Sequence, residues 1–421
     1  MAENSKIEWT DHTFNPWRGC TKVSPGCAHC YAETLSKRNP AVLGEWGEGK
    51  PRVLASEAMW RQPLKWDERA DEVMLEWEAN HTWQLAHGSV PSDPRPRRPR
   101  VFCASLGDWL DDEVPIEWLA RLLALIYETP NLDWLLLTKR PQNFREQLRS
   151  TLGPAGIGDV GMTENWLLGE PPANVWIGTS VEDQERADER IPALLGIPAR
   201  VRFLSCEPLL GPVDLSYVGG DQVATPTRLR GNFWEVSCLN QCTFVGLEED
   251  LIADPEQAEA DKDGTRWVCP ECHSDSALIY RNPNDPEIHW IIGGGESGPN
   301  ARPMHPDWAR SLRDQCQSAG VPFLFKQWGE WGLKDDWPDN PSTRQFDDPA
   351  HAGQLVRWTC QSSSDRSRVD VVTWNAHDAQ GRVTRLEKLG KKKAGRLLDG
   401  REWNEFPVVE AEAPRSATSA T

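Results

Sequence analysis

The feature that most constrains the fold of this chain is a repeated alternation of short apolar runs with helical patterns. Seven such runs recur, and each ends in polar or glycine-rich residues. Near-continuous apolar runs followed by amphipathic stretches are typical of parallel strands that are buried on both faces. We therefore predict an α/β fold in which six or seven strand–helix units form a partial (β/α) barrel of the TIM type. The runs are the segment leading to Cys20, then residues 101–105, 133–138, 175–180, 201–207, 289–292 and 321–326.

Helical patterns follow most of these runs. Apolar residues recur at helical spacing after the second to fourth runs and after the sixth, and one further helical stretch lies outside the alternation. Short turns and polar residues separate each helix from the next strand, as parallel α/β units require. The predicted helices begin near Cys27 and cover about 116–127, 141–148, 182–195 and 307–319, with the additional helix at about 67–85.

Two long segments interrupt the alternation and suggest a domain division. We predict a barrel over 1–335, a cysteine-rich insertion within it at 217–288, and a carboxyl-terminal extension at 336–421. The insertion is polar and acidic, and the extension has few periodic signals. The stretch after Pro407 is rich in Ala, Glu, Ser and Thr, a composition typical of disordered chain.

The net charge of −18 limits the partners of a chain of 421 residues. An acidic surface repels nucleic acid and anionic membranes, so contact with a nucleic acid or nucleotide requires a local basic patch. Residues 91–100 and 388–401 are such patches. No apolar run approaches the roughly 20 residues of a membrane span, and the polar amino terminus lacks the apolar core of a signal peptide. We therefore expect a cytoplasmic protein with no membrane partner, in which the eleven cysteines are reduced and available to metals.

Three cysteines near the amino terminus form a metal-binding pattern with an open position. Cys20, Cys27 and Cys30 lie close together after a short aromatic run. Three thiolates can hold three corners of an iron–sulfur cluster and leave the fourth iron free for another ligand. The alternative is a closed zinc site completed by His12 or His29.

Four further cysteines lie in the insertion and predict a zinc-ribbon-like site. Two close pairs separated by a longer stretch are the usual pattern of tetrahedral Zn²⁺ coordination. Zinc would stabilise a segment with little apolar core, in a structural or protein-partner role. The four residues are Cys238, Cys242, Cys269 and Cys272.

Polar residues gather where the predicted strands end. The carboxyl ends of parallel strands form one edge, so these residues should surround a common mouth. Glu207 and Lys326 are the candidate catalytic residues. The glycine-rich segment 293–298 fits a dinucleotide-binding pattern, but three prolines follow it where a helix would have to begin, so close backbone approach to a ligand is favoured. The strand-end set is Cys20, Asp108, Thr138, Lys139, Thr179, Ser180, Glu207, Glu296, Lys326 and Gln327.

Several of these motifs resemble the phage-associated three-Cys-motif family, which is similar to radical S-adenosylmethionine enzymes. The resemblance covers most of residues 5–335 and a short carboxyl-terminal segment, but not the cysteine-rich insertion. It is carried by Cys20, Cys27 and Cys30 with the following Tyr-Ala-Glu, by 105–108, 178–180, 206–210, 294–298 and 325–329, and by 393–400.

The resemblance implies a partial barrel in which the three cysteines bind a [4Fe-4S] cluster. S-adenosylmethionine would chelate the fourth iron, and its reductive cleavage would yield a 5′-deoxyadenosyl radical that abstracts a substrate hydrogen. His29 would lie beside the adenine, and Ser105 and Asp108 would contact the methionine ammonium or the ribose. Apart from the resemblance, the predicted strand ends and the glycine-rich segment add further candidate cofactor-binding residues: Thr179, Ser180, Gly294, Gly295 and Glu296.

Two features depart from the usual radical-enzyme pattern. Six residues, rather than three, separate Cys20 from Cys27, and the Gly-Gly-Glu motif follows the sixth predicted strand rather than the second. Two alternatives therefore stay open: a non-catalytic zinc protein that binds a protein or nucleic-acid partner, and an iron–sulfur repair-type enzyme that does not cleave the cofactor.

Overall fold

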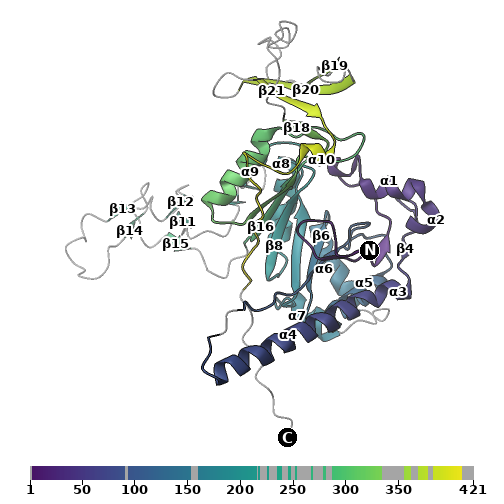
Figure 1. Cartoon of the computed structure of the whole chain (residues 1–421), viewed down its shortest axis with the longest axis vertical. Helices are drawn as coiled ribbons and strands as arrows, with labels where there is room; N and C mark the ends of the chain where they lie inside the picture. Colours follow the sequence, from purple (N-terminus) through teal and green to yellow (C-terminus); the bar gives the residue numbers. More distant parts are fainter. Residues whose placement is uncertain are drawn as a thin grey trace.

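A curled parallel sheet forms the centre of the molecule in this computed structural model (Figure 1). The structure describes residues 2–90, 93–152, 160–215, 287–333 and 383–409, together with the strand backbone in parts of 217–280 and 355–377. Strand β1 is antiparallel to β2, and the seven strands from β2 to β17 are parallel and curl into a half-barrel. The predicted α/β fold with a parallel, partly closed sheet is confirmed. In spatial order the strands are β1 (Ala2–Glu3), β2 (His12–Thr13), β5 (Arg100–Cys103), β6 (Asp133–Thr138), β7 (Val175–Ser180), β8 (Val201–Cys206), β16 (Trp290–Gly294) and β17 (Phe323–Gln327).

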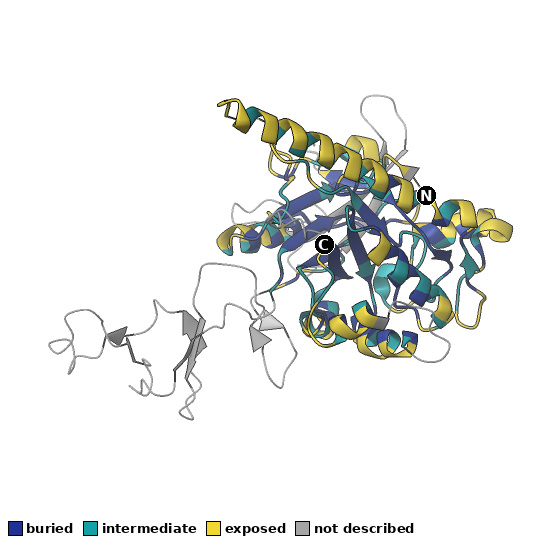
Figure 2. Cartoon of the chain, turned by 90° about the horizontal axis from the view of Figure 1, so that it is seen from below, coloured by how far each residue is buried: buried dark blue, intermediate teal, exposed yellow. Residues whose placement is uncertain are grey.

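Helices cover the convex face of the half-barrel. Strand residues such as Trp134 and Ile177 point outward and join helix residues such as Leu122 and Ile191 in the larger apolar core. Figure 2 shows the strands buried and the outer faces of the helices exposed. Each such buried side chain contributes about 1.5–3 kcal/mol of transfer free energy. The helices are α1 (Tyr31–Arg38), α2 (Pro40–Leu43), α3 (Glu57–Trp60), α4 (Gln62–Ala86), α5 (Ile116–Glu128), α6 (Phe144–Thr151), α7 (Val160–Leu167), α8 (Gln184–Leu195), α9 (Pro306–Ser318) and α10 (Lys391–Ala394), with 3₁₀ turns η1 (Pro25–Cys27) and η2 (Pro141–Asn143).

Side chains on the concave face change in size along the strands. Alternate residues of a strand share a face. Large residues near the amino ends of the strands form a second apolar core inside the half-barrel, whereas small or polar residues occupy inward positions nearer the carboxyl ends. Among the described residues, these smaller side chains leave space at the carboxyl edge. The large set comprises Phe102, Leu135, Trp176, Phe203 and Trp290, and the second set includes Ala104, Ser180, Ser205 and Lys326.

One glycine on the concave face is required by packing. A Cβ atom at Gly178 would lie 2.3 Å from the ring of Phe203. The absence of a side chain on β7 therefore lets the Phe203 ring of β8 lie across the interior of the half-barrel.

Segments from both ends of the described chain complete the inner core. Ile7 and Trp9, before β2, pack on the same concave surface as Phe406 and Val409. Leu398 and Trp403 belong to the larger core, so part of the predicted carboxyl-terminal extension contributes to both cores. Residues 410–421, which include most of the stretch predicted to be disordered, lie outside the described residues.

The remaining strands form small sheets. β3 (Trp17–Arg18) pairs with β4 (Val53–Leu54), and β18 (Trp331–Leu333), β21 (Val383–Lys388), β20 (Arg368–His377) and β19 (Leu355–Gln361) form a four-stranded sheet. The insertion contains β9 (Tyr217–Val218), β10 (Thr225–Pro226), β11 (Glu235–Cys238), β12 (Val245–Leu247), β13 (Ile252–Ala253), β14 (Trp267–Val268) and β15 (Leu278–Tyr280). The predicted zinc ligands Cys238, Cys242, Cys269 and Cys272 have side chains outside the described part of the structure, so zinc binding there stays a prediction.

The first strand–helix unit differs from its prediction. β2 is only two residues long, and Cys20 follows β3 in a loop rather than ending a long strand. The helix expected near Cys27 begins at Tyr31, because Pro25 starts a 3₁₀ turn that ends at Cys27. Within the residues described, none of the helices combines the length and apolar character needed to cross a bilayer.

Candidate functional site

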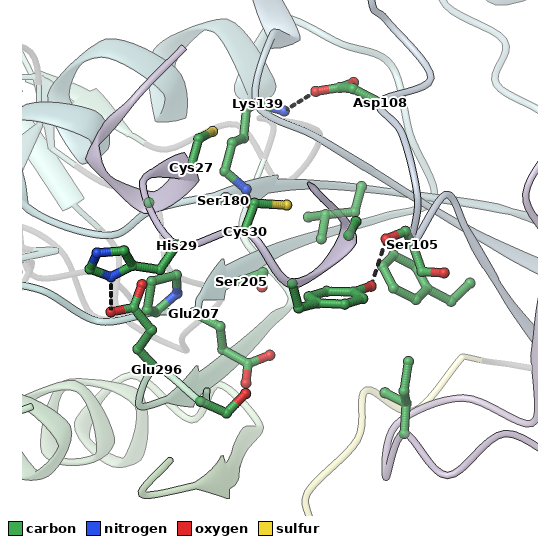
Figure 3. Close-up of a pocket in the computed structure, with 18 of the residues that line it drawn as sticks. Cys27, His29, Cys30, Ser105, Asp108, Lys139, Ser180, Ser205, Glu207 and Glu296 are labelled. Carbon is green, nitrogen blue, oxygen red and sulfur yellow. Dashed lines mark hydrogen bonds and ion pairs between the residues drawn. The ribbon is translucent and has the colours of Figure 1, made fainter. Parts of the chain in front are cut away.

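A cavity of about 510 Å³ opens at the carboxyl edge of the parallel strands (Figure 3). Its walls come from the cysteine loop, from the ends of the strands and from segments near both termini. Most of the residues predicted to form a site line it: Cys20, Cys27, His29, Cys30, Ser105, Asp108, Thr138, Lys139, Ser180, Glu207, Gly295, Glu296, Lys326 and Gln327. Thr179 and Gly294 lie beside it and are not among its lining residues.

The three amino-terminal cysteines share this cavity as free thiols. Burial raises the pKa of Cys20 to about 12, with repulsion from Asp108 adding to the rise and attraction to Arg140 opposing it. Burial also raises the pKa of Cys30, while the amides of Glu33 and Ala32 at the start of α1 and the charge of Lys139 oppose it. Both thiols are therefore protonated near neutral pH, and a metal that binds them must displace their protons.

The loop between Cys20 and Cys27 is anchored at three points. Arg140, just after β6, donates to the carbonyl oxygen of Thr21 at 2.9 Å and lies 3.7 Å from the Cys20 sulfur. Glu182, just after β7, accepts from the amide of Gly26 at 3.1 Å. Arg302, after β16, donates to the carbonyl oxygen of Pro25 at 3.0 Å. The six-residue gap therefore contains the groups that fasten this loop to three strand ends.

Asp108 organises the wall next to Cys20. Its carboxylate accepts from the Thr138 hydroxyl at 2.7 Å, from the Lys139 amide at 2.8 Å and from Arg140 at 3.1 Å. The side chain is buried. Asp108 thus holds the β6 end in place while it lines the cavity.

Lys139 extends between the cysteines and the β7 end. Its ammonium donates to the Ser180 hydroxyl at 2.9 Å, and Figure 3 shows it between Cys27 and Cys30. The neighbouring Thr179 side chain instead donates to the Thr138 carbonyl oxygen at 2.9 Å and is fully buried. Ser180, rather than Thr179, presents its hydroxyl to the cavity.

Glu296 forms a charged group on the opposite wall. Arg302 donates to its two carboxylate oxygens at 2.7 and 2.9 Å, and His29 Nδ1 lies 3.2 Å from one of them. Burial by itself would raise the pKa of Glu296, but the hydrogen bonds from Arg302 and His29 lower it below its ordinary value. Glu296 is therefore ionised and fixed beside the cysteine loop.

Glu207 and Lys326 form an ion pair across the end of the sheet, with the ammonium nitrogen 3.2 Å from the carboxylate oxygen. Glycine packs closely beside them: a Cβ atom at Gly294 would lie 2.7 Å from a Glu207 oxygen. Gly295 is equally constrained: its Cβ would lie 2.0 Å from the Trp328 carbonyl oxygen. The glycines thus serve close packing of the strand ends.

Ser105 and Tyr31 connect the cysteine helix to the β5 end. The Tyr31 hydroxyl donates to the Ser105 carbonyl oxygen at 2.6 Å, and the Ser105 hydroxyl bonds Asn15. Tyr31 is 53% exposed, so its ring forms an accessible wall of the cavity.

A family model described as "Protein of unknown function (DUF5131)" matches residues 4–407. The chain belongs to the DUF5131 family. No curated protein and no solved structure matches it. The matched range of this DUF5131 protein includes every residue of the cavity and the cysteine-rich insertion.

Sequence reasoning missed several residues that shape the site of this DUF5131 chain. Arg140 and Glu182 each lie just beyond a predicted strand. The expectation that functional polar residues follow the carboxyl ends of parallel strands could therefore have identified them. Arg302 lies in a proline-rich segment in which no motif and no periodic pattern indicated a site residue. Within the described residues, the indole nitrogen of Trp46 and the Gln327 side-chain oxygen are buried without a hydrogen-bond partner, and both residues line the cavity.

The three cysteines line one cavity without forming a site for one metal ion among the described residues. Across the described residues, no three His, Cys, Asp or Glu side chains surround a single metal position. Thiolates that bind different irons of one cluster need not converge on a single point. His12, an alternative zinc ligand, stacks on Trp66 at 4.3 Å between ring centroids and does not line the cavity. His29 lines it and is held by Glu296.

Proposed function

We propose that this DUF5131 protein is an iron–sulfur enzyme of the radical S-adenosylmethionine type. One observation carries the proposal: Cys20, Cys27 and Cys30 lie as free thiols in one cavity at the carboxyl edge of a parallel half-barrel, with no fourth cysteine among the residues that line it. When bound, a [4Fe-4S] cluster and S-adenosylmethionine would supply a 5′-deoxyadenosyl radical for hydrogen abstraction.

The cationic residues next to the cysteines support an anionic metal centre. Arg140 lies against Cys20 and Lys139 extends toward Cys30, so their charges stabilise thiolates once the protons have left. Hydrogen bonds and charges around the ligating sulfurs also set the reduction potential of such a centre. Arg140 and Lys139 would therefore stabilise the cysteine thiolates and adjust the reduction potential of the cluster that they bind.

The wall across from the cysteines supports binding of a zwitterionic cofactor. Glu296 stays ionised, so it attracts an ammonium group, and Gln327 offers an acceptor oxygen that has no partner among the described residues. Ser105 lies at the β5 end and Ser180 at the β7 end, where their hydroxyls reach polar groups of a ligand. These residues bind and orient the cofactor.

The Glu207–Lys326 pair supports a role in proton handling. The Lys326 ammonium donates to a Glu207 oxygen, and both side chains are largely buried at the cavity wall. The pair places a proton donor, the Lys326 ammonium, beside a proton acceptor, the Glu207 carboxylate, so each could exchange a proton with a ligand bound in the cavity. We assign them as the acid–base candidates of the site.

Anaerobic purification with counts of iron, sulfide and zinc tests the proposal. We expect about four irons and four sulfides per chain, and formation of 5′-deoxyadenosine after reduction with S-adenosylmethionine. Cys27→Ala should remove the iron, whereas Cys316→Ala should keep it, because Cys316 is buried away from the cavity.

Each other outcome decides against the proposal in a different way. Zinc without iron in the wild type, lost with Cys27→Ala, indicates the non-catalytic zinc protein. A stable cluster that never yields 5′-deoxyadenosine indicates an iron–sulfur enzyme that leaves the cofactor intact. Iron that survives Cys27→Ala unchanged places the metal elsewhere in the chain.

A further inference from the structure

Lysines gather on the cavity although the whole chain is strongly acidic. The net charge is −18, yet five lysines line this one cavity. Lys22 is paired with Glu33 at 2.7 Å and Lys139 bonds Ser180. The five are Lys6, Lys22, Lys139, Lys326 and Lys391.

The carboxylates of the cavity do not cancel this charge, because cations already neutralise most of them. Asp108 is paired with Arg140 at 3.1 Å, and Glu296 with Arg302 at 2.7 Å. Glu207 is paired with Lys326. Glu8 is the remaining lining carboxylate among the described residues, and it is exposed to solvent. A positive excess therefore remains.

Two of the lysines stand at opposite edges of the half-barrel. Lys6 precedes β2, near one edge of the parallel sheet, and Lys391 begins α10, which packs on β18 beyond the other edge at β17. Both line the same cavity. The unclosed side of the half-barrel, where a full barrel would have further strands, is therefore flanked by positive charge.

The charge at the β17 edge continues from the cavity onto the surface. Lys391, Lys392 and Lys393 follow one another on α10, and all three are exposed. Within the described part of the chain none of them forms an ion pair with a carboxylate. A single phosphate would need one such group, whereas three unpaired lysines that fan out around one helical turn at the cavity can attract several phosphates.

We propose that the substrate is a nucleic-acid strand that inserts one nucleotide into the cavity and lays its adjoining phosphates along Lys391–Lys393. The inserted base would stack on Tyr31, which lines the cavity, since aromatic faces bind bases irrespective of their sequence. The inference rests on the proposed function for what is done to that nucleotide, but the binding itself requires no cluster.

Fluorescence anisotropy of a labelled single-stranded oligonucleotide with the anaerobically purified full chain tests the proposal. Charge reversal at Lys391 and Lys392 (Lys391→Glu with Lys392→Glu) should weaken binding about tenfold and reduce the salt slope by about 0.7 for each lysine. The matched control is Lys65→Glu, also exposed, on α4, which lies well apart from α10 in Figure 1. The milder Lys391→Ala with Lys392→Ala repeats the comparison if charge reversal disturbs folding.

Three results would overturn it. The first is unchanged affinity in both α10 variants. The second is an equal loss with Lys65→Glu, which indicates unspecific attraction to any surface lysine. The third is competition by a nucleoside monophosphate as effective as by the oligonucleotide, which indicates a free nucleotide rather than a strand.

Alkylation of the cavity cysteines shows whether the bound strand enters the cavity. In cluster-free protein, peptide mass spectrometry should find Cys27 and Cys30 alkylated more slowly when the oligonucleotide is present. An unchanged rate would contradict entry into the cavity. Because neither measurement needs iron, failure here is distinct from failure of the iron count.

Discussion

Glu182 joins the cysteine loop to the core: one of its carboxylate oxygens accepts from the Gly26 amide at 3.1 Å and the other from Arg190 at 3.0 Å. The side chains of Glu182 and Arg190 are 1% and 2% exposed. A Cβ atom at Gly26 would lie 2.9 Å from the same carboxylate, so glycine permits this approach. The position of the cysteines therefore depends on a buried charge pair at the start of α8.

Removal of this carboxylate should be strongly destabilising. Glu182→Ala leaves Arg190 buried and unpaired, so we expect a loss of about 3–5 kcal/mol in the free energy of unfolding, measured by urea denaturation. Glu182→Gln keeps an acceptor and should lose less. The control Glu185→Ala, at an exposed position of the same helix, should change stability by less than about 1 kcal/mol. Equal losses of unfolding free energy in Glu182→Ala and Glu185→Ala would show that the Glu182–Arg190 pair does not stabilise the fold.

The same carboxylate should make stability depend on pH. Burial by itself would raise the pKa of Glu182, but Arg190 and Lys139 lower it below its ordinary value of 4.5 in the folded protein. A group with a lowered folded pKa stabilises the fold above its unfolded pKa, and this contribution is lost as the pH falls through the folded pKa. Below pH 4.5 the wild type should therefore lose more stability than Glu182→Gln. Parallel urea midpoints for the two proteins across about pH 3–6 would refute this.

Gly178→Ala should destabilise the half-barrel through crowding. Its new methyl group would meet the Phe203 ring at 2.3 Å in a buried strand. We expect a loss of about 1–3 kcal/mol, measured by thermal or urea unfolding. Gly211→Ala is the matched control, since a Cβ atom there would lie 3.5 Å from its nearest neighbour, the Cβ of Asp183. A Gly178→Ala protein as stable as this control would mean that the ring moves aside freely.

Arg140→Lys should loosen the proposed metal centre while it keeps the charge. A lysine cannot contact Cys20, Thr21 and Asp108 together, as the forked guanidinium does. We expect metal affinity to fall about 10- to 100-fold, measured as the rate of iron release to a chelator. Arg149→Lys, on the solvent-facing side of α6, should release iron at the wild-type rate. Identical rates for the two variants would remove Arg140 from the site.

The sheet could be predicted from the sequence because its strands are buried on both faces. The run at 133–138 coincides with β6 and the run at 175–180 with β7, since continuous apolar residues leave no other placement. The long helix α4 was also predicted, although it begins five residues before its apolar pattern does. The first strand–helix unit, which begins with β2, was predicted less well, because β2 is too short to form an apolar run.

The contacts that hold the cysteine loop could not be predicted. Arg302 and Pro25 are separated by 277 residues, and a single arginine outside any motif has no periodic signal that names its partner. The expectation that polar residues gather at the carboxyl ends of the strands did place Asp108 at the cavity. It gave no indication that four donors would surround the Asp108 carboxylate. The roles of Arg302 and Asp108 depend on contacts between segments that are distant in the sequence.

The three anchors of the cysteine loop connect ligand occupancy to the rigidity of the whole mouth. Residues 21–26 bond groups that follow β6, β7 and β16. Any ligand that fixes Cys20, Cys27 and Cys30 in the folded state adds its binding free energy to folding. Here it would also restrain three strand ends at once. The rates of proteolysis and of amide hydrogen exchange at the mouth should then fall as the fraction of protein with a ligand bound to the three thiols rises, and this can be measured without an activity assay.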